Sequence, residues 1–247
     1  MSDKIENSVI EIKNLKKSFD QQMVLKSISL QLKNGENLVV LGKSGSGKSV
    51  LIKCIVRLLT ADEGTITVIG NEMTTIHHEA LNEIRMKIGY LFQSGALYDS
   101  MTVKQNLAFP LRRMRNKISE KQVNEKINET LENVGLLDTI NKMPSQLSGG
   151  MKKRISLART LVVDPSIMLY DEPTTGLDPE TSSEISTLIN DVQRNYKTSS
   201  IIITHDIECA RSTANRIIML RDGLVYSEGT LDAFENSDDP HITSFFK

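Results

Sequence analysis

The sequence has 247 residues, of which 39% are hydrophobic and 25% charged, and its formal net charge is -1. This length and apolar content are enough to bury a full hydrophobic core in one large domain, or in a domain with a subdomain, and they argue against a disordered chain. The balanced charge excludes the bulk positive field that non-specific nucleic-acid binding requires, so we expect no nucleic-acid partner.

The two cysteines, Cys54 and Cys209, lie far apart and outside any CxxC or histidine-rich motif. We expect neither a disulfide framework nor a zinc site, and predict that both are packing residues in a reducing compartment. Residues 1–13 lack a basic segment followed by an apolar stretch, and the longest apolar runs, 38–41 and 201–203, have the length of strands. The expectation is a soluble, cytoplasmic protein that reaches a membrane only through a spanning partner.

The first predicted elements are strands around a short turn. Residues 28–33 alternate apolar and polar side chains as a half-buried strand does, Asn34-Gly35 predicts a hairpin turn, and residues 36–42 predict a strand that is apolar on both faces. Residues 50–59 predict a core helix that ends at Asp62-Glu63-Gly64, and residues 65–70 predict a returning strand.

Residues 94–160 differ from their surroundings, with few β-branched runs and more amphipathic helix, which predicts a helical subdomain. Ser119 and Gln122 form a capping box, and Gly135 stands where a C-terminal cap belongs. Between them, apolar residues follow at helical spacing: Val123, Ile127, Leu131 and Val134. The basic run at 112–117 is predicted to be a solvated face.

The last third of the sequence predicts two more strands buried on both faces, 166–170 and 200–204, and a closing hairpin around Asp222-Gly223. Strands that alternate with helices predict a parallel sheet covered on both faces, with ligands at the carboxyl ends of the strands. With the glycine-rich segment GKSGSGKS at 42–49 between a buried strand and a helix, the predicted fold is α/β: a P-loop NTPase core with an N-terminal antiparallel β subdomain and an inserted helical subdomain. The predicted parts of this single domain are 1–93, 94–160, 161–235 and a C-terminal tail, 236–247.

The segment GKSGSGKS, residues 42–49, matches the P-loop pattern and lies between a buried strand and a helix. Glycines let consecutive backbone N–H groups point at phosphate oxygens, Lys48 would reach the β and γ phosphates, and Ser49 would be a magnesium ligand. A plain glycine-rich turn is the alternative, which the strand and helix context disfavours. The predicted nucleotide-binding residues here are Gly42, Lys43, Ser44, Gly45, Ser46, Gly47, Lys48, Ser49 and Val50.

Asp171 and Glu172 end the predicted strand IMLYDEP. Adjacent strand residues point to opposite sides, so Asp171 is predicted to hold magnesium through water, and Glu172 to be the base that orients the attacking water. Without the P-loop, an Asp-Glu pair before a proline is often only a surface turn.

A second glycine pair, in LSGG at 147–150, begins another predicted helix and offers a further anion site at Ser148, Gly149 and Gly150. One nucleotide has only one γ-phosphate, which residues 42–49 already hold. This second site therefore needs a different nucleotide.

Six segments together resemble ABC transporter ATPase subunits in order and spacing: GKSGSGKS, LFQ at 91–93, LSGG, LYDEP, TGLD at 175–178, and His205 after a buried strand. The resemblance implies binding of ATP with Mg²⁺ and ATP hydrolysis. It also implies that LSGG faces the P-loop of a second copy, so that a head-to-tail homodimer encloses two ATP molecules. The chain departs from the commonest signature at Met151, where glutamine is usual, which puts any side-chain contact by that residue in doubt.

The resemblance assigns further roles by position. Phe19 resembles the aromatic residue that stacks on adenine, and Gln93 the glutamine that senses metal and water beside the γ-phosphate. Asp178 resembles the aspartate at the subunit boundary, and His205 the switch histidine that contacts the γ-phosphate. The alternatives are a core aromatic for Phe19 and a structural histidine for His205, while Gln93 carries no signal alone.

Residues 91–112 and 143–151 are closely similar to ATPase subunits of the Mla and Mce type, which move phospholipids between bacterial membranes. That likeness implies integral membrane permease partners, a substrate-binding protein with an Mce domain and a small STAS-type regulator. It also implies a peripheral position on the cytoplasmic face of the inner membrane. In the tail, Phe245 and Phe246 would either dock on a sister or partner subunit or pack on the chain's own domain.

Three other functions stay open at this stage. The chain could serve another ABC transporter, such as an amino-acid importer or a lipoprotein or drug exporter, because the segment after Gln93 shapes a permease-docking groove and never touches cargo. A soluble ABC ATPase is disfavoured because the sequence has neither heptad runs nor a second P-loop. A nucleotide-dependent interaction module without hydrolysis is disfavoured because Glu172 and His205 are both present.

Overall fold

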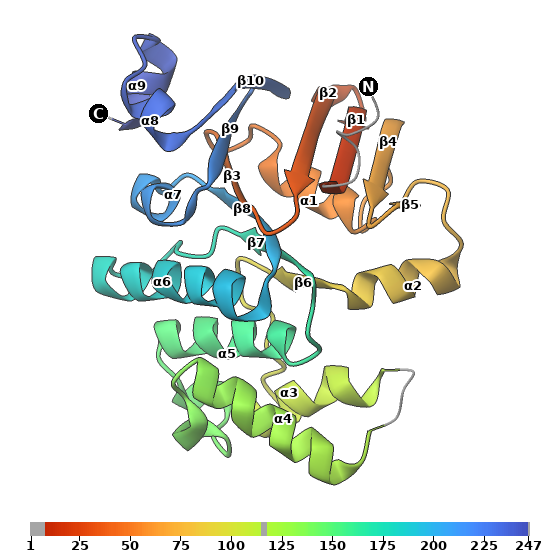
Figure 1. Ribbon diagram of the computed structural model, residues 1–247, viewed down its shortest axis with the longest axis vertical. Coiled ribbons are helices and arrows are strands. Elements are labelled where there is room, and N and C mark those ends of the chain that lie inside the picture. The colour runs from red at the N-terminus through yellow and green to blue at the C-terminus, as the bar shows by residue number, and fades with distance from the viewer. Residues whose placement is uncertain (1–7, 115–117, 247) are drawn as a thin grey trace.

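The computed structural model describes residues 8–114 and 118–246, which form two β-sheets and a set of flanking helices (Figure 1). The first sheet is antiparallel, with strand order β2-β1-β4-β5. Its strands are β1 (Ser8–Phe19), β2 (Gln22–Lys33), β4 (Glu63–Val68) and β5 (Asn71–Glu72). Figure 1 shows this sheet at one end of the molecule and the helices α3 and α4 at the other.

The second sheet has strand order β10-β9-β3-β8-β7-β6 and is parallel except for β10. Its strands are β3 (Asn37–Leu41), β6 (Ile88–Leu91), β7 (Ile167–Asp171), β8 (Ser199–Thr204), β9 (Arg216–Arg221) and β10 (Leu224–Gly229). Every residue of β3, β7 and β8 is buried, as a sheet covered on both faces requires. The closing hairpin is confirmed: Asp222 and Gly223 both have positive φ between the antiparallel strands β9 and β10.

The hairpin predicted around Asn34-Gly35 is wrong. The chain does turn there, with Gly35 at φ 70°, but β2 pairs with β1 while β3 lies between β8 and β9 in the other sheet. The reason is the difference between the two strands: β2 alternates buried and exposed residues, whereas β3 is buried throughout. A strand that is apolar on both faces is stable only inside a covered sheet.

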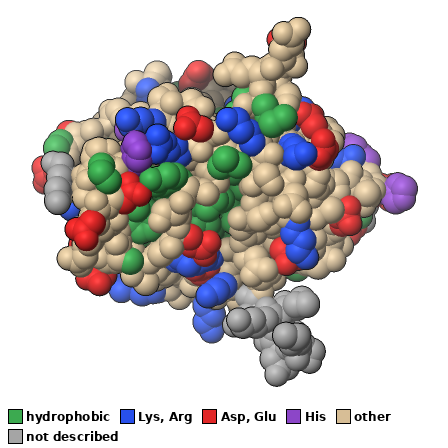
Figure 2. All heavy atoms as spheres, turned by 90° about the horizontal axis from the view of Figure 1, so that it is seen from above, with side chains coloured by type: hydrophobic (Ala, Val, Ile, Leu, Met, Phe, Trp, Pro, Cys, Tyr) green, Lys and Arg blue, Asp and Glu red, His purple; other side chains and the backbone are tan. Residues whose placement is uncertain are grey.

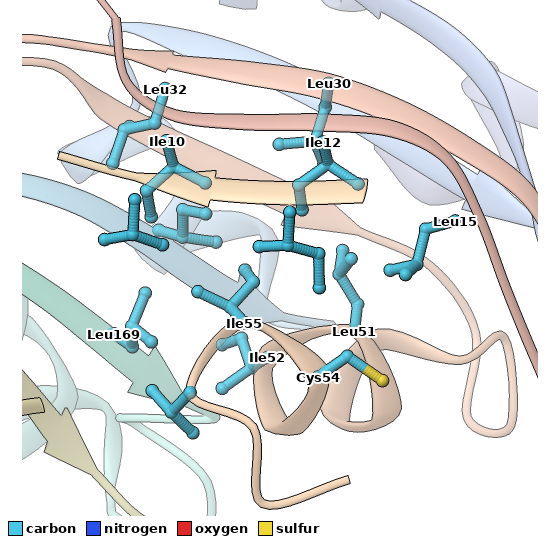
Figure 3. Close-up of a cluster of buried hydrophobic side chains, with 14 of the residues drawn as sticks. Ile10, Ile12, Leu15, Leu30, Leu32, Leu51, Ile52, Cys54, Ile55 and Leu169 are labelled. Atoms are coloured by element: carbon cyan, nitrogen blue, oxygen red, sulfur yellow. The ribbon is translucent and has the colours of Figure 1, made fainter. Parts of the chain in front are cut away.

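Helix α1 (Lys48–Ile55) fills the space between the two sheets. Figure 3 shows Leu51, Ile52 and Ile55 of α1 among side chains from the antiparallel sheet, and Leu169 of β7 nearby. Cys54 is buried in this cluster, and Cys209 is buried in the cluster on the other face of the parallel sheet. Both are free thiols, as predicted, and burial raises the pKa of each to about 11.

The predicted helix over 50–59 is too long, because α1 ends at Ile55. Arg57 has φ 55°, a left-handed conformation that no α-helix continues, and its guanidinium donates to the carbonyl of Ile76. Asp62 does not end the helix either. Its carboxylate accepts hydrogen bonds from Lys17 and from the backbone of Ser18, which ties the chain to β1 before β4 begins.

The other face of the parallel sheet is covered by the C-terminal part of α5 (Gly149–Leu161) and by α6 (Pro179–Tyr196), α7 (Ile207–Thr213), α8 (Leu231–Glu235) and α9 (Pro240–Phe246). Phe245 and Phe246 pack against this cluster, and the rings of Phe246 and Phe234 lie 6.0 Å apart. Of the two alternatives for the tail, packing on its own domain is therefore the arrangement of the single chain. No helix within 8–114 and 118–246 is long and apolar enough to cross a membrane.

A third apolar cluster joins α3 (Val103–Arg112), α4 (Glu120–Asn133) and α5 (Gly149–Leu161). The capping box at Ser119 and Gln122 is confirmed, and Gly135 follows α4 at φ 69°. Besides these helices the chain forms α2 (His78–Met86) and two short 3₁₀ helices, Leu137–Thr139 and Pro144–Gln146. The division of the chain into subdomains stays a prediction.

Charged side chains are well mixed on the surface. In the basic run, Arg112 is exposed and pairs with Glu120, and Arg113 lies 4.5 Å from the ring centre of Phe109, while 115–117 lie outside the described residues. Figure 2 shows Lys and Arg interspersed with Asp and Glu on the face seen from above. That face therefore carries no field of a single sign, in line with the balanced composition.

Replacing Ile52 with alanine should lower the free energy of unfolding by about 2–5 kcal/mol, because it leaves a cavity between the two sheets. Leu58, which is 51% exposed just after the same helix, is the matched control, and Leu58→Ala should change stability by less than about 0.5 kcal/mol. Urea titration followed by circular dichroism measures both. Equal midpoints for the two variants would show that α1 is not packed as described.

Candidate functional site

A cavity of about 950 Å³ lies beyond the carboxyl ends of the parallel strands. Strands β3, β6, β7 and β8 are each followed within two residues by a residue of this region, as expected for an open α/β sheet. The predicted site residues that line it are Phe19, Lys43, Ser44, Gly45, Gly47, Lys48, Ser49, Val50, Gln93, Glu172 and His205. The fold thus brings together predicted residues that are far apart in the sequence.

The loop at 42–47 needs glycine where it lies against its neighbours. A Cβ atom at Gly47, which has φ 100°, would lie 2.6 Å from the side chain of Leu25. A Cβ atom at Gly42 would lie 2.5 Å from Ser46 Oγ and 2.7 Å from the carbonyl oxygen of Leu220. Because the loop runs directly into α1, its backbone N–H groups and the positive end of the helix dipole form an anion site.

The amino group of Lys48 is held beneath this loop. It donates to the carbonyl oxygens of Gly42 at 2.6 Å and Lys43 at 3.3 Å, and lies 3.6 Å from Glu172 Oε1. Burial lowers the pKa of Lys48, and the charge of Glu172 acts in the opposite direction. The loop therefore presents a fixed cation beside the anion site, where phosphate oxygens would lie.

Ser49 and Asp171 form the part of the site that suits a magnesium ion. Ser49 Oγ donates to Asp171 Oδ1 at 3.0 Å, and Tyr90 Oη donates to Asp171 Oδ2 at 3.2 Å. A hydroxyl and a carboxylate are the hard oxygen ligands that Mg²⁺ prefers, and few protein ligands leave room for phosphate and water. Within the described residues no group of three or more His, Cys, Asp or Glu could hold a metal ion. The Ser49 hydroxyl and the Asp171 carboxylate fit an Mg²⁺ ion whose other ligands would be phosphate and water.

Sequence reasoning missed Tyr90. It lies on β6, next to Leu169 of β7 in the strand register, which places its hydroxyl beside the end of β7. Burial raises its pKa, and the neighbouring Asp171 raises it further, so the phenol stays protonated and acts as a donor. The only available signal was its position three residues before Gln93, which does not indicate the contact.

The strand-alternation argument for Glu172 is wrong. Strand β7 ends at Asp171, and Glu172 has φ 52°, a left-handed conformation. Its backbone N–H donates to the carbonyl of Ile203 at 2.9 Å, so the residue leaves β7 while still attached to β8. The sharp turn, not the period of a strand, separates the Glu172 carboxylate from that of Asp171.

The carboxylate of Glu172 is held from several sides. His205 Nδ1 lies 2.8 Å from Oε2, the backbone N–H of His205 donates to the same oxygen at 3.3 Å, and Thr175 Oγ1 donates to it at 3.2 Å. The other oxygen faces Lys48. A buried carboxylate fixed in this way beside an anion site can orient a water molecule and accept its proton.

His205 and Phe19 both lie at the cavity with accessible side chains. The His205 side chain is 58% exposed and its Nδ1 is paired with Glu172, so its contact with the γ-phosphate stays a prediction beside the alternative of a structural histidine. Phe19 is 42% exposed at the end of β1, so the alternative of a core aromatic is wrong as well. An exposed ring face can stack on a planar base.

Gln93 lines the cavity, and its carbonyl oxygen accepts a hydrogen bond from the buried Lys153 at 2.9 Å. Lys153 is a second residue that sequence reasoning missed. The predicted contact of the Gln93 side chain with metal stays a prediction.

Ser148, Gly149, Gly150 and Asp178 do not line this cavity. Ser148 caps α5 by accepting from the N–H of Met151, and Asp178 caps α6 by accepting from Thr181. A Cβ atom at Gly150 would lie 2.5 Å from Thr181, so the two helix starts lie against each other and form one surface, which we call the signature surface.

The side chain of Met151 packs against the apolar cluster of α3, α4 and α5. The side chain is only partly buried there, and the effect of Met151 on the site stays open to experiment.

The comparisons with known proteins agree with this geometry. Residues 25–175 match the family model described as ABC transporter. The chain is 36% identical over 240 residues to the methionine import ATP-binding protein MetN of Brucella abortus, covering 97% of this chain and 64% of that protein. It is also 36% identical over 254 residues to protein TRIGALACTOSYLDIACYLGLYCEROL 3, chloroplastic, of Arabidopsis thaliana, covering 96% of this chain and 73% of that protein.

Among solved structures, the dimeric ATP-binding cassette MJ0796 bound to ADP and phosphate superposes with a TM-score of 0.82 at 33% identity, covering 90% of this chain and 98% of that one. The chain therefore belongs to the ABC transporter family, as an ATPase domain that binds ATP with Mg²⁺. It spans less than two thirds of the length of the MetN relative, so the transport activity, cargo and partners of the whole protein are matters for proposal.

Replacing Glu172 with glutamine keeps the shape of the side chain but removes its charge. We expect kcat for ATP hydrolysis to fall about 100-fold or more, because the water loses its base, while ATP still binds. Phosphate release from Mg-ATP and binding of a fluorescent ATP analogue measure the two effects. The matched control is Glu125→Gln on the exposed face of α4, and wild-type turnover in Glu172→Gln would remove Glu172 from this role.

Proposed function

We propose that this chain is the ATP-hydrolysing subunit of a membrane transporter, that it works as a head-to-tail homodimer, and that the cargo is phospholipid, as in the Mla and Mce type. One observation carries the dimer: the signature surface and the nucleotide cavity are separate in a single chain. Each presents hydrogen-bond donors at a helix start, so each can bind an anion.

Within one chain, the loop at 42–47 and Lys48 bind the phosphates of ATP, and Ser49 and Asp171 hold the metal ion. Magnesium, when bound, neutralises charge on the phosphate oxygens. Glu172 orients the attacking water and takes its proton, while His205 keeps Oε2 of that carboxylate in place. Phe19 stacks on the adenine, and the side-chain amide of Gln93 senses the metal and the water beside the γ-phosphate.

Across the dimer, Ser148, Gly149 and Gly150 of one copy bind the γ-phosphate held by the other copy, and Asp178 lies at the boundary. Closing the dimer completes both pockets, and hydrolysis removes the phosphate that the two halves share. The likeness to a cassette that is dimeric with ADP and phosphate supports this arrangement.

The cargo follows from likeness alone. Support for phospholipid comes from the similarity of residues 91–112 and 143–151 to Mla and Mce ATPases and from the relative named after a glycolipid. The partners would be integral membrane permeases, a protein with an Mce domain and a STAS-type regulator, with the ATPase peripheral on the cytoplasmic face of the inner membrane. The MetN relative, at the same 36% identity, favours a second candidate, an amino-acid importer.

Glu172→Gln should form a dimer only when ATP is present, because bound ATP is then not hydrolysed. Adding Ser148→Arg places a bulky cation on the signature surface and should abolish that dimer. Size-exclusion chromatography with light scattering measures both, and Thr187→Arg on the exposed side of α6 is the control. An ATP-dependent dimer that survives Ser148→Arg, or no dimer with Glu172→Gln, would contradict the proposed interface.

A tagged chain purified from solubilised native membranes should bring with it a permease and a protein with an Mce domain. Phospholipid vesicles should then stimulate the ATPase activity of that complex, whereas the Lys48→Ala complex should stay inactive. If a permease co-purifies without an Mce-domain protein, and methionine stimulates the ATPase activity in place of phospholipid, the proposed cargo would be an amino acid and not phospholipid.

A further inference from the structure

Lys153 is a buried cation for which the proposed chemistry has no use. It lies on α5, one helical turn after Gly149, and only 6% of its surface is exposed. Burial lowers its pKa, while the charges of Asp171 and Glu172 raise it. An apolar side chain of similar volume would fill this position without the cost of burying a charge, so the contacts of the amino group need a reason.

Those contacts go to the backbone of two predicted site residues. Lys153 Nζ donates to the carbonyl oxygen of Gln93 at 2.9 Å and to that of Glu172 at 3.4 Å. Hydrogen bonds from a charged donor are stronger than neutral ones. The amino group therefore joins the loop after β6 to the residue that follows β7.

The bond to Glu172 acts on a strained residue. Glu172 has φ 52°, which costs about 1–3 kcal/mol for a residue with a side chain. Its N–H is held by the carbonyl of Ile203 on one side, and its own carbonyl is held by Lys153 on the other. The two peptide groups that fix the direction of the Glu172 side chain are thus both anchored, one by β8 and one by α5.

The same face of α5 follows the segment 93–96. Ser156 lies three residues after Lys153 on α5, and its Oγ would be 2.6 Å from a Cβ atom placed on Gly95. Three residues further still, Arg159 donates to the carbonyl of Ala96 at 2.6 Å. Spacing of three residues places Lys153, Ser156 and Arg159 on one side of the helix, so a movement of α5 moves this segment with it.

We propose that Lys153 is a positioning residue that couples the signature surface of a chain to that chain's own hydrolytic site. This inference rests on the proposed dimer, in which Ser148–Gly150 at the start of α5 binds the nucleotide of the other copy. Docking of that end fixes α5, and Lys153 then fixes the carbonyls of Gln93 and Glu172 around the chain's own ATP. Occupancy of one pocket thereby sets the geometry of the other.

The test is Lys153→Met, which keeps an unbranched side chain one atom shorter than lysine and removes both hydrogen bonds. We expect kcat for ATP hydrolysis to fall between about 10- and 100-fold, the cost of a misplaced catalytic group, with KM for ATP within about 2-fold of wild type. Lys153→Arg, which can still donate to both carbonyls, should recover at least about half of the loss on a logarithmic scale. Lys152→Met, the same change at the exposed neighbour on the same helix, should have no effect.

A kcat for Lys153→Met within 2-fold of wild type, or no recovery in Lys153→Arg, would overturn the inference. If Lys153→Met does not fold, the kcat of Lys153→Arg against that of Lys153→Gln, whose shorter side chain cannot reach both carbonyls, decides in the same way. ATP-dependent dimerisation of Glu172→Gln with Lys153→Met should persist. Loss of that dimer, when Glu172→Gln alone still forms it, would show a structural role for Lys153. Failure of Glu172→Gln itself to dimerise would overturn the proposed dimer and with it the coupling, whereas the kcat of Lys153→Met tests the positioning of Gln93 and Glu172 separately.

Discussion

The placement of one carboxylate, that of Glu172, is the constraint on which the rest of the site depends. The residue is left-handed directly after β7, so its side chain cannot take its direction from the strand. Contacts from the P-loop lysine, from His205 and from Thr175 hold the carboxylate itself, and β8 and α5 hold the backbone. Four segments, the P-loop, the stretch after β7, the end of β8 and α5, must meet to hold the proposed water-activating group, which is why the site lies at the carboxyl edge of the parallel sheet.

Sequence reasoning succeeded where the controlling interactions are local. The loop at 42–49, the helix caps and the strands buried on both faces depend on neighbours within a few residues, and their patterns were sufficient. It failed where a distant partner decides. Asn34-Gly35 has the composition of a hairpin turn, but β3, the strand that follows it, pairs with β8 and β9 in the buried parallel sheet. Tyr90 and Lys153 act through hydroxyl and amino groups whose partners lie on other elements, so no spacing in the sequence indicates them.

The separation of the cavity from the signature surface follows from how α5 packs. Its N-terminal turn lies against the start of α6 through Gly150 and Thr181, and none of Ser148, Gly149 and Gly150 lines the cavity. Its C-terminal part packs on the parallel sheet through Leu157 and Leu161. A helix fixed at both ends in this way cannot bend its first turn back to the cavity, so the cavity and the signature surface stay separate in a single chain.

The charges inside the site explain why it needs two buried lysines. Asp171 and Glu172 are adjacent, both nearly buried, and two such carboxylates repel each other. Lys48 lies beside one oxygen of Glu172, and Lys153 reaches the peptide on its other side, so each lysine lies close to the pair. Burial lowers the pKa of both lysines, and the charges of the same two carboxylates oppose that shift. The two lysines and the two carboxylates therefore form one cluster in which positive and negative groups are equal in number. Removing Lys48 would leave an uncompensated negative charge where the phosphates of ATP must enter, whereas Lys153 lies outside the cavity lining and acts on the backbone of Glu172.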